Sequence, residues 1–409
     1  MTTEPRAPAG GREPAWRIFR IFLRLGLTSF GGPVAHLGYF REEFVTRRRW
    51  LEDRAYADLV ALCQFLPGPA SSQVGMGIGL ARGGLPGALL AWLGFTMPSA
   101  LALMAFAVGV GGMRGTLDAG WLHGLKVVAV AVVAQAVWGM GRSLCPDAPR
   151  MSVAALAAIA ALAWPTAPGQ VVVIAGAAAL GLLSPRVEGE RPHAALGIAV
   201  SRALGVAALA LFLALLLALP LASAMLPWRG LAVADSFYRS GSLVFGGGHV
   251  VLPLLQAEVV PRGWVTQDAF LAGYGAAQAV PGPLFTFSAY LGMAMAAGLQ
   301  GLALALLCLV AVFLPSLLLI VGALPFWEAL RRLGPVQSAL RGVNAAVVGL
   351  LLAALYQPVW ISAILAPADF GLGLGAFTLL TFWKAPPWLV VALTAAAGGA
   401  LGTLGIGHG

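Results

Sequence analysis

The hydrophobic residues of this chain are gathered in long stretches that are separated by short polar segments. Residues 85–110, 195–219 and 299–324 are each long enough to cross a hydrocarbon core of about 30 Å, which needs ~20 helical residues. Shorter apolar stretches of the same kind follow each of them. The pattern therefore predicts an all-α polytopic membrane protein that lies in the lipid bilayer.

Four crossings are expected in each half of the chain, and one unpaired crossing is expected between the halves. Segment 151–164 is short for a crossing, so the boundaries are soft. The predicted crossings are residues 85–111, 117–141, 151–164 and 169–183, then 195–226, then 299–324, 335–356, 370–383 and 387–404.

The two halves repeat four blocks of sequence in the same order. GLTSFGGPVAHL at 26–37 matches GSLVFGGGHVVL at 241–252, and RRWLEDRAYADLVALCQFLPGP at 48–69 matches RGWVTQDAFLAGYGAAQAVPGP at 262–283. MPS at 97–99 answers LPS at 314–316, and LHGLKVVAVAVV at 122–133 answers LRGVNAAVVGLL at 340–351. Agreement at four successive blocks predicts a duplicated unit.

Charge predicts that the two copies are inverted relative to one another. The loop at 41–54 carries five arginines, whereas the equivalent loop at 256–268 carries one. Cytoplasmic loops are enriched in Lys and Arg, so the two loops are expected on opposite sides of the membrane. The expected division is an N-terminal repeat at 16–184, a linker with a connecting helix at 185–230 and a C-terminal repeat at 231–409. The N-terminus is then cytoplasmic.

Composition supports this class and excludes others. The chain is 59% hydrophobic and 10% charged, against roughly 25% charged residues in soluble domains. Its net charge of +9 lies in short loops, which is typical of a topology signal rather than of nucleic-acid binding. Cys63, Cys145 and Cys308 lack metal-ligand spacing, so free thiols are expected, with no metal site and no cofactor.

A Pro-Gly-Pro segment behind a glutamine occurs once in each half, and we call these the first break (Pro67, Gly68, Pro69) and the second break (Pro281, Gly282, Pro283). Each break separates two half-helices that are too short to cross the bilayer, which predicts a re-entrant hairpin. A helix that begins after the second proline exposes unpaired amides and the positive end of its dipole, which bind anions.

Small polar side chains surround both breaks and would complete a dehydrated anion pocket near the midplane. The alternative is that each break only kinks a helix and that its polar neighbours serve packing. The predicted binding residues are Gln64, Pro67, Gly68, Pro69, Ser71, Ser72, Gln73, Gln278, Pro281, Gly282, Pro283, Thr286 and Ser288.

The motifs FGGP and FGGGH offer two interpretations. Gly31, Gly32, Gly246 and Gly247 could form a second pair of broken helices that gate the site or approach the hairpins closely, or they could serve close helix packing. His36 and His249, within or beside these motifs, fit a polar packing role better than a ligand role.

Charged residues near the apolar segments give weaker signals. Lys126 lies within a predicted crossing, opposite Asn344 in the repeat, and a charge there is a functional-site hypothesis. Both residues are therefore included among the binding candidates, although a lysine can also extend to the interface. Glu43 and Glu258 lie in equivalent loops, where a solvated charge is expected rather than proton coupling.

The motifs FGGP, RRWL, QFLPGP and GGLPGALLAWLGFTMPS, repeated as FGGGH, GW, QAVPGP and FLPS, resemble the chromate transporter family in its long, two-domain form. The resemblance extends over the chain beyond residue 16. It implies an inner-membrane protein that exports chromate. It leaves open sulfate or another tetrahedral oxyanion as the substrate, and a homodimer as the assembly.

The membrane potential favours one direction of anion transport. A dianion that leaves a negative interior gains roughly 4–5 kcal/mol at 100 mV, so export by uniport or anion exchange needs no coupled ion.

A channel is an alternative function to a carrier. A lipid-modifying enzyme is disfavoured, because the sequence has no His/Asp cluster and no nucleotide-binding loop. A scaffold subunit would not explain the duplicated polar breaks.

Overall fold

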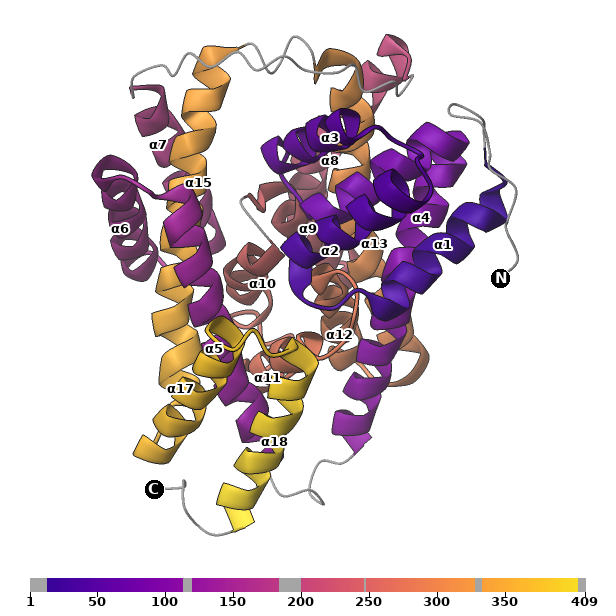
Figure 1. Cartoon of the computed structure of the whole chain (residues 1–409). Helices are drawn as coiled ribbons and strands as arrows, with labels where there is room; N and C mark the ends of the chain where they lie inside the picture. Colours follow the sequence, from indigo (N-terminus) through magenta and orange to yellow (C-terminus); the bar gives the residue numbers. More distant parts are fainter. Residues whose placement is uncertain (1–12, 113–119, 184–199, 246–247, 328–332, 404–409) are drawn as a thin grey trace.

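The structure of the chain is a computed structural model that describes residues 13–112, 120–183, 200–245, 248–327 and 333–403, and in these ranges it contains helices and no strand (Figure 1). The first half begins with α1, which is followed by two short helices and then by the segments around the first break. Its elements are α1 (Ala15–Thr28), α2 (Gly32–Arg41), η1 (Glu42–Arg47), α3 (Asp53–Phe65), α4 (Ala70–Gly112), α5 (Gly120–Leu144), α6 (Ala148–Ala163) and α7 (Ala167–Leu182).

A peripheral helix, α8 (Arg202–Met225), then connects to a second series of similar elements. Many large apolar side chains of α8 are exposed, as expected of a helix that faces lipid. The second series is α9 (Arg229–Leu243), η2 (Gly248–Val250), α10 (Val251–Val259), α11 (Gln267–Ala277), η3 (Leu284–Thr286), α12 (Phe287–Ala294), α13 (Gly298–Ala323), η4 (Leu324–Phe326), α15 (Gly334–Ala354), η5 (Leu355–Trp360), α16 (Ile361–Ala363), α17 (Pro367–Thr381) and α18 (Pro387–Thr403).

The backbone repeats its left-handed positions at a constant spacing of 214 residues. Gly68 and Gly282 have φ angles of 119° and 99°, and Gly84 and Gly298 have φ angles of 64° and 62°. Arg49, at φ 53°, is equivalent to a glycine, Gly263, at φ 67°. The chain therefore turns at the same positions in both halves, and Arg49 adopts a conformation that favours glycine.

Helix α4 consists of two limbs that join at Gly84. The φ and ψ angles of Gly84 are 64° and −157°, which no α-helix contains. A methyl group at Gly79 would lie 2.4 Å from the carbonyl oxygen of Gly87, so the limbs pack closely against each other instead of forming one rod. The predicted return segment after the first break and the crossing after residue 85 are therefore separate helices.

The last two helices of each half pack on a long helix of the other half. Helix α5 contacts α17 and α18, whereas α15 contacts α6 and α7 (Figure 1). Equivalent glycines allow both contacts: a methyl group at Gly124 would lie 2.4 Å from Thr394 O, and one at Gly342 would lie 1.9 Å from Ala177 O. The halves thus exchange helices reciprocally.

Within the described ranges, five helical stretches are long and apolar enough to cross a membrane: Ala70–Val110, Gly120–Leu144, Arg202–Met225, Gly298–Phe326 and Gly334–Ala363. The helices α6, α7, α17 and α18 have 16, 16, 15 and 17 residues. At 1.5 Å per residue they are about 22–26 Å long, less than the ~30 Å core. The sequence predicts these segments to be crossings, but their lengths lie at or below the lower end of the range for a transmembrane helix.

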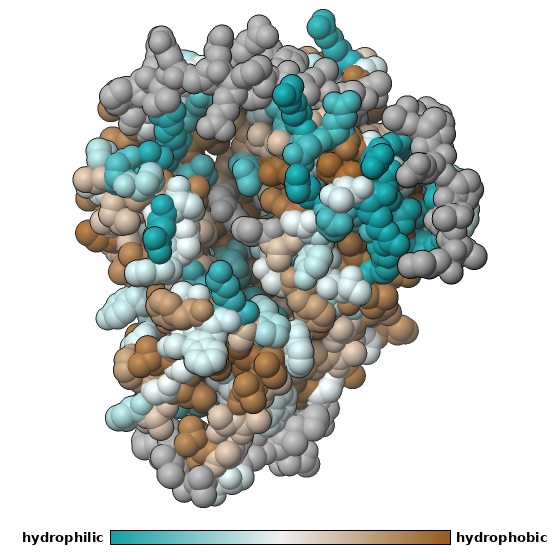
Figure 2. Space-filling view, in the orientation of Figure 1, coloured by the Kyte–Doolittle hydropathy of each residue, from teal (hydrophilic) through white to brown (hydrophobic). Residues whose placement is uncertain are grey.

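In Figure 2 brown hydrophobic residues are mixed with white ones over the lower part of the view, while strongly hydrophilic residues gather mainly toward the upper right, around α1 and α3. Large exposed apolar side chains also occur on α6, α7 and α13. This distribution is typical of a protein that contacts lipid around its sides.

Candidate functional site

The first break connects α3 to α4 and is fixed by a contact with the other half of the chain. Helix α3 ends at Phe65 and α4 begins at Ala70, so Pro67, Gly68 and Pro69 lie between them. The amide of Gly68 donates a hydrogen bond to the carbonyl oxygen of Val244, at 2.6 Å. Its φ of 119° is one that residues with a side chain rarely adopt.

The second break makes the equivalent contact in the opposite direction. Helix α11 ends at Ala277, and the short helix η3 begins at Leu284. The amide of Gly282 donates to the carbonyl oxygen of Ser29, at 2.9 Å. Ser29 and Val244 are equivalent in the repeat, because each precedes the phenylalanine of a Gly-rich motif. Each break is therefore held by the Gly-rich segment of the other half.

Each break glycine also abuts a serine of the other half. A methyl group at Gly68 would lie 2.5 Å from Ser316 Oγ, and one at Gly282 would lie 2.8 Å from Ser99 Oγ. Ser99 and Ser316 are the serines of the repeated MPS and LPS segments, which sequence reasoning aligned but did not assign to the site. Their pairing across the halves could have been inferred only from the folded arrangement.

The two Gly-rich motifs meet between the breaks. A methyl group at Gly248 would lie 3.3 Å from Cγ of Pro33, its equivalent in the first half. Gly31 and Gly32 have φ angles of 98° and 76°, but a methyl group would meet only Ala35 Cβ at Gly31 and nothing within 4 Å at Gly32. Both glycines thus supply left-handed backbone conformations, and among the described residues no distant segment lies within 4 Å of a methyl group at either of them. Gly246 and Gly247 lie outside the described residues.

His36 connects the two breaks. Its Nε2 lies 3.2 Å from the carbonyl oxygen of Ser29, and its Nδ1 lies 3.4 Å from Ser71 Oγ. A carbonyl oxygen only accepts, so Nε2 carries the hydrogen, and in a neutral ring Nδ1 accepts from the Ser71 hydroxyl. His36 therefore links the helix after the first break to the carbonyl that holds Gly282, a role beyond the packing expected from sequence.

Five buried polar atoms near the breaks have no hydrogen-bond partner among the described residues. They are Ser29 Oγ, Ser72 Oγ, Gln73 Oε1, Thr96 Oγ1 and Ser316 Oγ. Gln73 also places its Nε2 2.8 Å from Pro67 O, within the first break. Buried polar groups are nearly always hydrogen-bonded, so a group of unpartnered atoms is unusual. Ser29, Thr96 and Ser316 were not among the sequence candidates.

The polar residues after the second break are satisfied locally. Thr286 Oγ1 donates to Pro283 O, and Ser288 Oγ donates to Phe285 O, both at 2.7 Å. Gln278 Nε2 lies 3.5 Å from Tyr274 O, a weak contact along its own helix. Gln64, its equivalent before the first break, is exposed.

Lys126 pairs with the other half of the chain. Its Nζ lies 3.0 Å from Oδ1 of Asp268, whose side chain is 74% exposed, while that of Lys126 is 14% exposed. The ammonium group thus extends toward the surface at the beginning of α11. The repeat partner of Lys126, Asn344, is half-buried on α15. The structure brings neither residue into the polar group around the breaks.

Glu43 and Glu258 are buried within arginine clusters, so the expectation of solvated loop charges was wrong. Arg48 Nε donates to Glu43 Oε1 at 2.6 Å, and Arg24 and Arg47 also pair with this carboxylate. Glu258 accepts from Arg239 and Arg262, both at 3.1 Å. Some of these arginines are distant in sequence and others lie on the neighbouring turn. Their contacts bury the carboxylates, so a position in a loop did not predict exposure to solvent.

Two cavities reach residues beside the breaks, and both are lined by apolar side chains. One, of about 250 Å³, lies between α4 and α13 and includes Met76, Trp92 and Phe313. The other, of about 310 Å³, lies between α4, α5, α11 and α18 and extends to Ala279 and Val280.

Cys63, Cys145 and Cys308 are buried free thiols. No group of three His, Cys, Asp or Glu side chains able to hold a metal occurs in the described ranges.

Comparison with known proteins assigns the chain to a family. The chromate transporter model matches residues 16–182 and 231–400. A chromate transport protein of Pseudomonas aeruginosa is 29% identical over 93% of this chain and 90% of its own length. A probable chromate transport protein of Synechococcus elongatus is 27% identical over 94% of this chain and 96% of its length. No solved structure matches. The two segments matched by the family model cover most of this chain, which has several apolar helices. The chain therefore belongs to the chromate transporter family.

Proposed function

We propose that the protein is a secondary transporter that exports chromate, a tetrahedral dianion, from the cytoplasm across the inner membrane. The substrate occupies a neutral polar site beside the breaks, formed by Ser72 and Gln73, which the sequence singled out, together with buried polar groups that it did not. Membership of the chromate transporter family and the names of the relatives support chromate as the substrate.

One observation carries the proposal: unpartnered polar atoms are buried beside the first turn of α4 and beside Gly68. A helix begins with amides that have no acceptor within the helix, and these amides attract anions. Ser72 and Gln73 lie in that first turn, and Ser316 Oγ faces the break from the other half. The hydroxyls of Ser72 and Ser316 have no partner among the described residues and are free to donate to oxyanion oxygens. Gln73 can offer only the second hydrogen of Nε2, because the first bonds to Pro67 O.

The protein consists of two inverted units, 16–184 and 231–409, joined by the linker at 185–230, with the N-terminus in the cytoplasm. The reciprocal bonds of Gly68 and Gly282 and the reciprocal exchange of helices support this arrangement. In it, both breaks reach the same depth of the membrane from opposite sides. The membrane potential then drives export, since two charges gain roughly 4–5 kcal/mol per 100 mV.

Lys126 and Asn344 have separate roles in the proposal. Lys126 attracts the oxyanion near one mouth of the path, where Asp268 holds its ammonium group near the surface. Asn344 is the neutral counterpart in the second half. The positive charge is therefore placed along the path and not within the binding site.

Uptake of labelled chromate into inside-out vesicles tests the proposal, with wild type compared with Gly68→Leu and Gly282→Leu. We expect saturable uptake that depends on an imposed potential and that both substitutions abolish, although the variants insert correctly. Uptake that ignores the potential and collapses only with a proton gradient would refute export driven by the potential. Uptake that survives in both variants would reduce the breaks to helix kinks.

Sulfate is the second candidate substrate, because hydroxyl and amide donors fit any tetrahedral dianion of similar size. The same vesicles test it by adding unlabelled sulfate in excess over labelled chromate. Competition would define a general oxyanion site. The absence of competition would assign the site to chromate.

A further inference from the structure

Several polar residues of the first half that lie around the breaks have apolar equivalents in the second half. In the repeat, Ser29 is equivalent to Val244, His36 to Val251, and Ser71 to Phe285. Gln73 is equivalent to Phe287, and Thr96 to Phe313. Five polar positions of the first half are therefore apolar in the second half.

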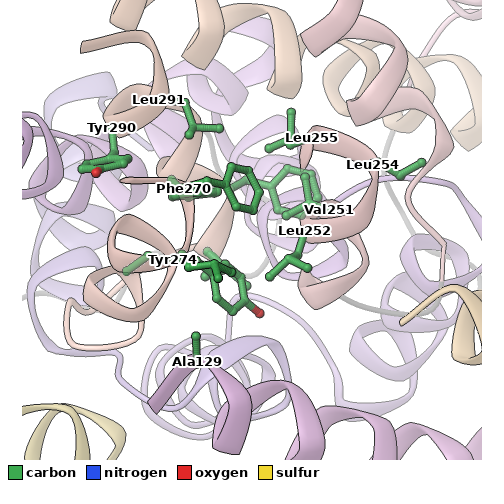
Figure 3. Close-up of a cluster of buried hydrophobic side chains, with 14 of the residues drawn as sticks. Ala129, Val251, Leu252, Leu254, Leu255, Phe270, Tyr274, Tyr290 and Leu291 are labelled. Carbon is green, nitrogen blue, oxygen red and sulfur yellow. The ribbon is translucent and has the colours of Figure 1, made fainter. Parts of the chain in front are cut away.

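The apolar equivalents form a packed core. The rings of Phe285 and Phe313 lie 5.8 Å apart, and that of Phe287 lies 5.1 Å from Phe270 and 5.8 Å from Tyr274. Figure 3 shows Val251, the counterpart of His36, in the same buried cluster as Phe270 and Tyr274. Three aromatic rings and two valines thus occupy, in the second half, the five positions that carry these polar groups in the first.

Hydrogen bonding follows the same division. Of the atoms without partners near the breaks, four belong to Ser29, Ser72, Gln73 and Thr96 of the first half, and the fifth is Ser316 Oγ, which faces the first break. Ser99 Oγ, the equivalent of Ser316 beside the second break, donates to Thr96 O at 3.1 Å. The buried polar atoms near the breaks that lack a hydrogen-bond partner therefore belong mainly to residues of the first half.

We propose that the protein has a single oxyanion site, lined by Ser29, Ser72, Gln73 and Thr96 together with Ser316, and that the equivalent region of the second half, where Phe287 and Phe313 replace Gln73 and Thr96, binds no ion. The inference rests on the proposed function and assigns the lining of the same site. All five side chains are neutral, so they hold a dianion by hydrogen bonds without an ion pair that would slow its release.

Two kinds of measurement on the purified full-length protein in detergent test the assignment. Equilibrium dialysis with labelled sulfate and with chromate gives the Kd and the number of ions per chain, and thermal unfolding without anion gives the Tm. The test variants are Thr96→Val and Ser72→Ala, which remove unpartnered hydroxyls. The matched controls are Thr394→Val and Ser242→Ala, whose hydroxyls donate to Val390 O and Tyr238 O.

We expect one ion per chain. Thr96→Val and Ser72→Ala should each raise the Kd about tenfold or more, because each removes a donor to a charged ligand. Their Tm should stay equal or rise, since an unpartnered buried hydroxyl costs stability in the empty protein. The controls should show the reverse, a lower Tm with an unchanged Kd. Phe313→Leu, in the second-half core, should likewise lower the Tm and leave the Kd unchanged.

The outcomes separate this inference from the proposed function. Two ions per chain, a wild-type Kd in both test variants, or a Kd that rises as much in Phe313→Leu would overturn the single-site assignment while leaving oxyanion binding intact. A wild-type protein that binds neither sulfate nor chromate would overturn the assignment and the proposed function together.

Discussion

Gly68 donates its amide hydrogen to the carbonyl oxygen of Val244, a residue of the other half of the chain. The equivalent glycine, Gly282, returns the same bond to Ser29. A displacement of either break relative to the opposite half must therefore stretch a hydrogen bond that belongs to both halves. The reciprocal pair couples the two breaks mechanically, which suits a site that opens to one side of the membrane at a time.

Gly68→Ala and Gly282→Ala are expected to impair both folding and transport. Each methyl group would lie within 3 Å of a serine hydroxyl, and each backbone adopts a φ that disfavours a side chain. Strain of this kind costs on the order of 1–3 kcal/mol. The Tm in detergent and chromate uptake in vesicles should both fall. Gly139→Ala, where no atom lies within 4 Å, serves as the control and should retain both.

Arg49→Gly is expected to stabilise the protein. Arg49 is exposed and adopts a φ of 53°, whereas the repeat has Gly263 at the equivalent position. Relief of a left-handed conformation contributes roughly 1 kcal/mol, partly offset by the greater freedom of glycine in the unfolded chain. The Tm should rise in Arg49→Gly and fall in the mirror variant Gly263→Ala. Equal Tm values for the wild type and both variants would show that the backbone at Arg49 is not strained.

Glu43→Gln is expected to weaken the protein at neutral pH and to reduce its sensitivity to acid. Burial alone would raise the pKa of Glu43, but the hydrogen bond from Arg48 and the charges of Arg48, Arg24 and Arg47 outweigh it, so this pKa is lowered. A lowered pKa adds stability above the ordinary value of 4.5 that is lost as the pH falls through the folded-state pKa.

The loss in Glu43→Gln should be about 2 kcal/mol at pH 7, because three partly exposed arginines then lack their counter-charge. Thermal unfolding between pH 7 and pH 3.5 measures it, and the gap from wild type should close at the acid end. The control is Glu42→Gln, an exposed neighbour. A gap that stays constant with pH would contradict the assigned ionic role.

Lys126→Met and Asp268→Asn are expected to change the KM for chromate in opposite directions. The first removes an attractive charge, and the second removes a repulsive charge and frees the ammonium group. At low ionic strength each shift should be about two- to fivefold, upward for Lys126→Met and downward for Asp268→Asn, and added salt should reduce both. If both variants raised the KM alike, the pair would act only as a structural link between the halves.

The parts of the fold that depend on local chemistry could be predicted from sequence. The consecutive residues Pro67, Gly68 and Pro69 interrupt the helix, so the end of α3 and the beginning of α4 follow from the order of residues. The turn at Gly84 lies close to the predicted boundary between the return segment and the next crossing. The repeated blocks predicted a duplicated unit, and Gly68 and Gly282 do share a left-handed φ.

Contacts between the halves could not be predicted in this way. Ser316 meets Gly68 only because two segments that are far apart in sequence fold together. Lys126 is a charge within an apolar segment, and its partner Asp268 lies 142 positions away. The unpartnered Ser29 and Thr96 have no sequence signature, since a serine or threonine in a membrane helix ordinarily bonds to its own backbone.

The reciprocal exchange of helices has a consequence for how the chain is made. While the ribosome is still adding the second half, α5 waits in the membrane with the glycine face at Gly124 uncovered. Helix α18, which covers this face against Thr394, follows all the other described elements of the second half. The first half therefore reaches its final packing only after α18 has been synthesised. A chain that stops before α18 leaves that glycine face bare.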